Sequence, residues 1–289
     1  MSHQVKDIIK LMEDIAPTHL AEPWDNVGLL VGSEQASVDK IMVTLDVTDD
    51  VIKQAVYEKV DLIISHHPVL FQAIKEINDT TKTGSTLLQL IHSGISVYSA
   101  HTNFDKAKGG TDDTLAELLE LRNISPLKLG LSTENVAAQL DVSSSNINSE
   151  TSSGFGSLGR IGQLAEPLCL EEYLKRIMKA LGTDSVDFIG DPALKIQVVT
   201  SCTGAGGDFI EEAQKAGADL FVTGEAKYHE QLPVLEGNMA LAVFGHYATE
   251  YPAVLSLKRR LQNIIHALQW KVDVISPQDY RSCFRRLQE

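Results

Sequence analysis

Metal-type ligands follow three apolar, strand-like segments of this chain, at the point where each segment ends. The ligands are His66 and His67 after residues 60–64, His101 and Asp105 after residues 95–98, and His246 and Glu250 after residues 239–244. In open α/β sheets, ligands bind in the crevice beyond the carboxyl ends of the strands. Imidazoles mixed with carboxylates suit Zn²⁺, Mn²⁺ or Fe²⁺. The sequence therefore predicts a metal centre made of histidine and carboxylate ligands.

His66 and His67 are adjacent in the sequence. Successive side chains of an extended backbone point to opposite sides, so one ion would rarely use both residues. Two ions lying side by side would use both, and a bridged pair of ions is the arrangement that this doublet favours. The alternative is that both are ordinary loop histidines.

His246 and Glu250 are four residues apart at the expected start of a helix. That spacing places both on one helix face, within reach of one ion or of a bridged pair, with Glu250 as the bridging carboxylate. The alternative is a plain surface pair. Asp105 lies four residues after His101 and is either a ligand or a turn former. His101 either matches His246 by position or only orients Asp105.

A second polar group, Glu225 with His229, follows the strand-like segment 218–223. Either side chain could move a proton if it lies within hydrogen-bond reach of the reacting group. We therefore name both as candidate catalytic residues, against the alternative of a surface loop. The Gly-rich segment 202–208 offers backbone N–H groups for an anion or forms a tight turn.

The elements that must position these residues alternate between strand and helix. Apolar residues three and four apart predict an amphipathic helix over 5–15. The later pattern is strand 40–47, helix 48–58, strand 60–65, helix 83–93, strand 95–100 and helix 110–121, then helix 170–181, strands 185–189 and 195–201, and helix 208–216. Alternation of this kind predicts mostly parallel or mixed sheets.

The second half of the chain repeats the first. A strand from Lys40 leads to a helix and the segment 60–67, and a strand from Lys195 leads to a helix and the segment 218–225. We predict an α/β protein of two related lobes, 1–125 and 126–289, with the metal site in the cleft that separates them. The Ser-rich segment 143–158 predicts a mobile loop in the second lobe.

The overall composition argues against some classes of function and of cellular location. The 289 residues are 43% hydrophobic and carry a formal net charge of −14, which argues against a nucleic-acid backbone as the main partner. Three widely spaced cysteines favour a reducing compartment. The chain shows no signal-like segment and no long apolar run, so we expect a cytoplasmic protein without a membrane span.

Six segments together resemble one known family. They are residues 24–29 (WDNVGL), 65–68 (SHHP), 101–105 (HTNFD), 110–113 (GTDD), 223–230 (TGEAKYHE) and 245–250 (GHYATE). This set is similar to the NIF-three-like family, also named GTP cyclohydrolase 1 type 2 homologues or dinuclear metal centre proteins. The resemblance covers about residues 5–275.

The resemblance implies two α/β lobes, a toroidal homohexamer and two divalent ions per chain. Its ligands, placed on this sequence, are His66, His67, Asp105, His246 and Glu250. It also implies a metal-dependent hydrolase of a small molecule, with ring opening of GTP as the candidate reaction. A non-catalytic metal scaffold or regulatory interaction protein is the alternative, and a nucleic-acid-associated regulator is disfavoured by charge.

Overall fold

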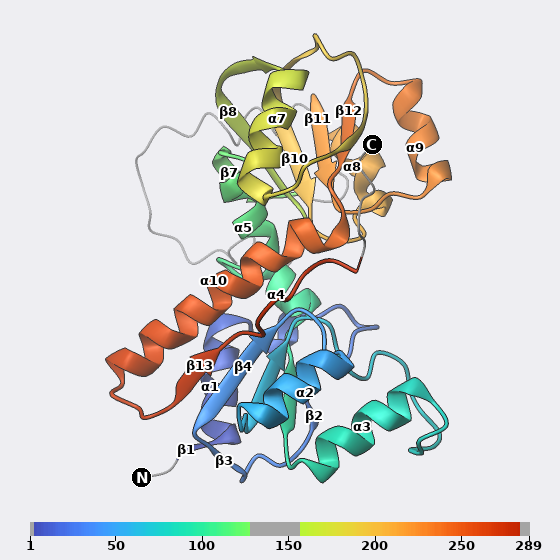
Figure 1. Ribbon diagram of the computed structural model, residues 1–289. Coiled ribbons are helices and arrows are strands. Elements are labelled where there is room, and N and C mark those ends of the chain that lie inside the picture. Colours follow the sequence, from blue (N-terminus) through green and yellow to red (C-terminus); the bar gives the residue numbers. More distant parts are fainter. Residues whose placement is uncertain (1–2, 128–156, 284–289) are drawn as a thin grey trace. The chain divides into compact units, whose positions relative to one another are not determined.

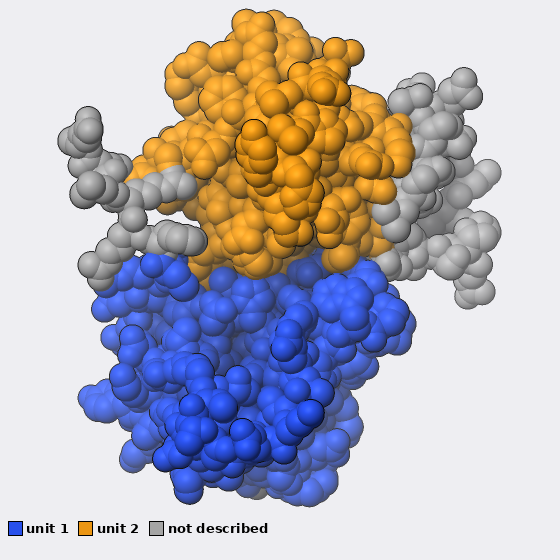
Figure 2. Space-filling model, turned by 90° about the vertical axis from the view of Figure 1, so that its right-hand side faces the viewer, with its two compact units in different colours: residues 1–110, 253–289 blue, residues 111–252 orange. Residues whose placement is uncertain are grey.

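A computed structural model describes residues 3–127 and 157–283 of the chain. Their contacts divide the chain into two compact units (Figure 2). Unit 1 comprises Met1–Gly110 and Ala253–Glu289, and unit 2 is Thr111–Pro252. The chain thus passes from one unit to the other twice. The lobes 1–125 and 126–289 expected from the sequence follow another division and stay a prediction.

Unit 1 contains a five-stranded sheet of order β13-β4-β5-β6-β2. Its strands are β13 (Asp273–Ile275), β4 (Lys40–Thr44), β5 (Leu62–Ser65), β6 (Ser96–Ser99) and β2 (Gly28–Val31). The first four are parallel, and β2 runs antiparallel to β6. A separate antiparallel pair joins β1 (His3–Gln4) to β3 (Ser37–Val38).

Helices cover both faces of this sheet. They are α1 (Val5–Ile15), α2 (Asp49–Tyr57) and α3 (Lys82–His92), and unit 1 also contains the short α4 (Thr102–Lys106) and a 3₁₀ turn, η1 (Thr18–Leu20). Ile52 of α2 and Leu90 of α3 pack with Met42, Ile63 and Val97 in one buried cluster. Figure 1 shows α2 and α3 on one face and α1 on the other. The central strands β4, β5 and β6 are accordingly buried on both faces, and most of their residues are apolar.

Unit 2 contains a six-stranded sheet of order β7-β8-β10-β11-β12-β9. Its strands are β7 (Arg122–Pro126), β8 (Arg160–Cys169), β10 (Lys195–Cys202), β11 (Leu220–Thr223), β12 (Ala240–Val243) and β9 (Asp187–Ile189). The three central strands β10, β11 and β12 are parallel, and the flanking strands pair antiparallel.

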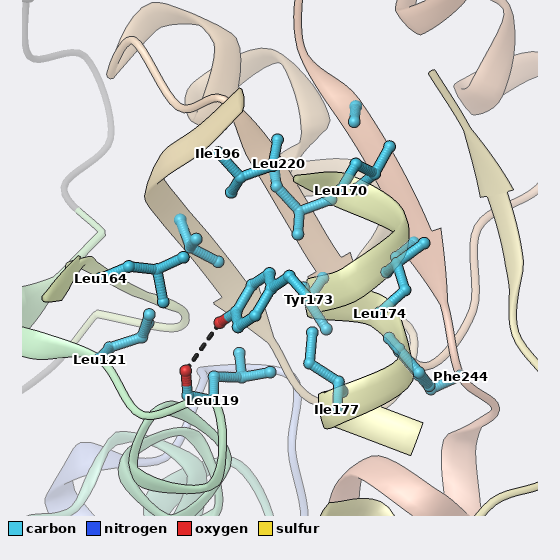
Figure 3. Close-up of a cluster of buried hydrophobic side chains, with 14 of the residues drawn as sticks. Leu119, Leu121, Leu164, Leu170, Tyr173, Leu174, Ile177, Ile196, Leu220 and Phe244 are labelled. Carbon is cyan, nitrogen blue, oxygen red and sulfur yellow. Dashed lines mark hydrogen bonds between the residues drawn. The ribbon is translucent and has the colours of Figure 1, made fainter. Parts of the chain in front are cut away.

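Helices α5 (Thr111–Leu118) and α7 (Leu170–Leu181) pack on one face of the second sheet in a large apolar cluster (Figure 3). The buried Tyr173 belongs to it, and its hydroxyl donates to the carbonyl of Leu119 at 2.7 Å. A second cluster joins α8 (Ile210–Lys215) and α9 (Tyr228–Leu235) to residues such as Phe221 and Leu241. The 3₁₀ turn η2 (Gly207–Phe209) precedes α8. The last helix, α10 (His246–Ala267), starts in unit 2 and ends in unit 1.

The same arrangement of hydrogen bonds occurs in both units. The carboxylate of Asp61 accepts from the N–H groups of Asp39 and Lys40, and that of Asp219 accepts from those of Gln197 and Val198. In each unit an Asp before the second parallel strand thus anchors the first strand. The predicted α/β class with related lobes and mixed sheets is confirmed.

The predicted loop at 143–158 lies almost entirely outside the described residues, which resume at residue 157. Among the helices that the structure does describe, none combines the length and apolar character needed to span a bilayer.

Candidate metal centre

Parallel pairing brings the ligand-bearing strand ends of unit 1 level with one another. Thr44 pairs with Ser65, and Ser65 pairs with Ser99. The ladder continues one step further, because the N–H of His66 donates to the Thr44 carbonyl and that of Ala100 to the Ser65 carbonyl. The backbone that carries the histidines is therefore an extension of the sheet and is held as firmly.

Three imidazoles converge beyond these ends. Candidate ligand atoms of His66, His67 and His101 all lie within 4.8 Å of one another. Their ring centroids are 5.1 Å apart for His66 and His67, 5.2 Å for His66 and His101, and 5.7 Å for His67 and His101. Asp105 Oδ1 lies 3.4 Å from His66 Nε2. The structure thus adds His101, whose role the sequence left open, to the donor group.

The Nδ1 atom of each ring faces an oxygen acceptor. His66 Nδ1 lies 2.9 Å from the Ala100 carbonyl, His67 Nδ1 2.7 Å from Asp46 Oδ1, and His101 Nδ1 2.9 Å from Asp25 Oδ1. A carbonyl or carboxylate oxygen has no proton to give, so the proton lies on Nδ1, and in the neutral ring this leaves the lone pair on Nε2. Oxygen partners on the far nitrogen are the usual support of metal-binding histidines. The residues present therefore fit a divalent ion.

Asp25 was not recognised as part of the site from the sequence. Its Oδ2 also accepts from the N–H and hydroxyl of Thr102, at 3.0 and 2.6 Å, so the same carboxylate starts α4 and orients His101. Burial opposes ionisation of Asp25, but the hydrogen bonds from His101 and Thr102 outweigh it and hold the pKa of this carboxyl well below its ordinary value. Asp25 is thus a charged partner for His101 at neutral pH.

Asp46 performs the corresponding task for His67. It follows β4, and its second oxygen accepts from the hydroxyl of Tyr280, while its own N–H donates to that hydroxyl at 3.0 Å. Burial and the Asp46 charge raise the pKa of Tyr280 far above its ordinary value, so the phenol stays protonated and donates. Tyr280, which lies 234 positions after Asp46 in the sequence, therefore holds the carboxylate that orients His67.

The predicted ligands of unit 2 also lie together at strand ends. His246 follows β12 and begins α10, and its Nε2 lies 3.0 Å from Oε2 of the buried Glu250 one turn later. Its Nδ1 lies 3.3 Å from Oε1 of Glu225, which follows β11 and has a side chain 56% exposed. Each nitrogen of His246 thus has a carboxylate beside it.

A glycine turn packs directly against this group. A Cβ on Gly204, whose φ is +60°, would lie 2.2 Å from Glu250 Oε1 and 3.2 Å from His246 Nε2. The N–H of Gly204 donates to Thr249 Oγ1 and that of Gly206 to Thr223 Oγ1, both at 3.1 Å. The segment 202–208 is therefore a tight turn whose donors bind the protein, and it leaves room for Glu250.

His229, the other candidate catalytic residue, lies on α9 with a side chain 74% exposed, and its Nε2 is 3.8 Å from Glu230 Oε1. The structure therefore brings Glu225 close to His246 and gives His229 a carboxylate partner on its own helix.

A cavity of about 580 Å³ lies beside one of the histidines of unit 1, His67. His67 lines it together with Thr86, Lys53 and Lys82, and the two lysines are paired with Asp50 and Asp49. A small molecule can thus approach His67 without a rearrangement of the core.

Two mixed α/β sheets with histidine and carboxylate side chains at their strand ends define a class of candidate metal-binding α/β proteins. The model of the Duf34/NIF3 (NGG1p interacting factor 3) family matches residues 3–281, so the chain belongs to that family. A Clostridium acetobutylicum protein named GTP cyclohydrolase 1 type 2 homolog is 34% identical, over 96% of this chain and 97% of its own length. Its namesake from Clostridium perfringens is also 34% identical, over 90% and 91%.

Solved structures agree on the fold. A Staphylococcus aureus hypothetical protein superposes with a TM-score of 0.85 at 27% identity, covering 99% of this chain and 100% of that chain. A Bacillus cereus protein related to NIF3 gives a TM-score of 0.87 at 22% identity, with the same coverage.

Replacing Gly204 with Ala should weaken metal binding, because the new methyl group would displace Glu250. The positive φ alone should cost roughly 1–2 kcal/mol of unfolding free energy. Gly182→Ala is the matched control, since Gly182 has a φ of +66° and a Cβ added there would meet no atom within 4 Å. Both variants should lose similar stability in urea unfolding, and only Gly204→Ala should lose metal affinity. Equal metal affinities of the Gly204→Ala and Gly182→Ala variants would contradict the idea that a side chain at position 204 displaces Glu250.

Replacing Asp46 with Ala should lower the affinity for Zn²⁺ by about 10–100-fold, the usual effect of losing such an outer partner. The cause is that His67 Nδ1 would lose its acceptor and the ring its fixed orientation. Competition with a chromogenic chelator measures the affinity. Asp50→Ala removes an exposed carboxylate that pairs with Lys53 and should leave the affinity unchanged.

Proposed function

We propose that this chain is a metal-dependent hydrolase of a small molecule, with GTP as the first candidate substrate. The observation that carries the proposal is the set of three imidazoles whose Nδ1 atoms all face oxygen acceptors. Such an arrangement prepares Nε2 lone pairs for a cation. GTP is a candidate because related proteins bear the name GTP cyclohydrolase 1 type 2 homolog.

The proposed ligands of two divalent ions, zinc, manganese or iron, are those predicted from the sequence: His66, His67, Asp105, His246 and Glu250. His101 joins them because it lies in the same donor group as His66 and His67. Two ions of this kind supply a nucleophilic water at neutral pH and neutralise charge that develops on the substrate.

Glu225 is the proposed general base. Its Oε1 lies 3.3 Å from Nδ1 of His246, a proposed metal ligand, so it would lie near a water bound to the metal ions. Its partial exposure lets it exchange the proton with solvent. During hydrolysis it would take the proton from the attacking water, which bonds to an electrophilic carbon or phosphorus. The proton would then pass to the leaving group. His229 is the second candidate for this transfer.

A non-catalytic metal-binding scaffold is the second candidate function. The exposure of Glu225 and His229 favours it, because an active site usually excludes water from its acid and base groups. The two functions make different predictions for turnover and the same prediction for metal content.

Purified protein should contain about two divalent ions per chain, and Glu250→Ala should contain at most about one, because a bridging carboxylate serves both ions. Elemental analysis after dialysis measures the content. Glu236→Ala, on an exposed residue just after α9, is the control. Full occupancy in Glu250→Ala would rule out the bridging role.

A steady-state screen of GTP and other nucleotides with metal-loaded protein tests the hydrolase itself. Asp105→Ala should abolish both activity and metal content. Glu225→Gln should reduce kcat by about 10²–10⁴-fold while the ions stay bound, as expected when a general base is lost. His229→Ala should slow turnover with metal intact. Wild-type rates in all three variants would assign the activity to a contaminant and favour the scaffold.

The homohexamer also stays a proposal and rests on the family resemblance. Multi-angle light scattering at micromolar concentration should give about six times the 31.6 kDa chain mass. A monomer mass would contradict it. Location in the cytoplasm and the absence of a nucleic-acid partner likewise remain predictions from composition.

A further inference from the structure

Two large aromatic rings lie exposed beside the histidines of unit 1. Trp24 is 60% exposed and Phe71 is 50% exposed, and their ring centroids are 6.0 Å apart in an edge-to-face arrangement. The ring of His101 lies 6.4 Å from Trp24 and 6.1 Å from Phe71. Exposed single apolar residues are common, but an exposed aromatic pair next to a candidate metal ligand calls for an explanation.

The turn that carries Trp24 is held at several points. The N–H of Asp25 donates to the Glu22 carbonyl, the N–H of Glu22 donates to Thr102 Oγ1 at 2.9 Å, and the Glu22 carboxylate pairs with Lys106 at 2.6 Å. Asp25 in turn is bound by His101 and Thr102. The indole is therefore presented to solvent by a fixed backbone.

Phe71 is tied to the same turn. The side-chain amide of Asn26 donates to the carbonyl of Leu70 at 2.5 Å, so the residue after Asp25 holds the residue before Phe71. One short segment, residues 24–26, thus positions Trp24, orients His101 through Asp25 and fixes the loop of Phe71. A rigid pair of aromatic rings loses little entropy when it receives a flat ligand.

We propose that Trp24 and Phe71 form the binding site for a planar heteroaromatic ring of the substrate. Stacking on an aromatic side chain suits any flat π-system, and the negative face of the ring gives no attraction for a phosphate. The cavity at His67 has polar walls and ion-paired lysines, and it suits a polar remainder of the molecule better than a flat ring. The assignment rests on the proposed function, because the ring is taken to belong to the molecule that the metal centre hydrolyses.

Fluorescence of Trp24 in the metal-loaded full chain tests the site. The chain has two tryptophans, and Trp270 stacks on His3 with centroids 4.1 Å apart, so Trp270→Phe keeps that stacking and leaves Trp24 as the sole indole. Guanosine and GTP should quench Trp24 with saturation, and inorganic tripolyphosphate should not. No quenching by guanosine, pterin or nicotinamide would overturn the proposal, as would equal quenching by tripolyphosphate.

Calorimetric titration with the tightest of these ring compounds gives the second measurement. Trp24→Ala should weaken binding by about tenfold, within the range of losing one stacking partner, and Trp24→Phe should recover most of it. Phe71→Ala should weaken binding less, because the Phe71 ring is tilted by 73° against the indole and meets a ring stacked on the indole only at its edge. Tyr57→Ala, which removes an aromatic ring 84% exposed on α2, should have no effect. Unchanged affinity in both Trp24→Ala and Phe71→Ala would refute the site.

The outcomes separate this inference from the hydrolase proposal. Ring binding that depends on Trp24, without turnover of any bound compound, would leave the inference standing and count against the hydrolase. Hydrolysis whose KM and kcat are unchanged in Trp24→Ala would leave the hydrolase standing and refute the ring site.

Discussion

The candidate centre depends first on the register of parallel strands. Asp61 and Asp219 each accept from the two N–H groups just before the residue at which the neighbouring strand begins its parallel pairing, Ile41 and Val199. From there the ladders run in step, so that Thr44, Ser65 and Ser99 end level in unit 1. A slip of one residue would turn the buried side chains to the opposite face. It would also separate the histidines, so the same pairing serves the core and the ligands.

The second requirement is a fixed orientation for every imidazole. Each Nδ1 of the unit 1 group meets an acceptor from a different part of the chain: the Ala100 carbonyl, Asp46 and Asp25. Asp25 also begins α4, and Asp46 is held by Tyr280 near the end of the described chain. With Nδ1 bonded to these acceptors, Nε2 is the atom that each ring would offer to an ion. The outer partners thus hold the three rings in the orientation that a metal site requires.

The sequence predicted what depends on local pattern. Apolar runs ending in His66, His101 and His246 marked the strand ends, and the spacing of His246 and Glu250 placed them one turn apart at a helix start, as observed. It missed Asp25 and Asp46, because their partners lie 76 and 21 residues away and an acidic residue in a loop carries no signal of what it will contact. The pairing of Tyr280 with Asp46 and the crossing of α10 from one unit to the other are long-range outcomes of packing.

A metal centre provides chemistry but little discrimination among substrates, so specificity must come from the side chains around it. The formal charge of −14 opposes an anionic substrate in general, and Lys53 and Lys82 beside His67 are already paired with carboxylates. Binding of a triphosphate such as GTP would therefore depend on the proposed metal ions to neutralise its charge. Near His101, the rings of Trp24 and Phe71 are exposed to solvent and could contact a ligand. Residues 24–26 hold both rings and also orient His101. In the proposed site, recognition and metal binding would thus share one short segment, residues 24–26, whose hydrogen bonds hold both the indole and the partner of His101.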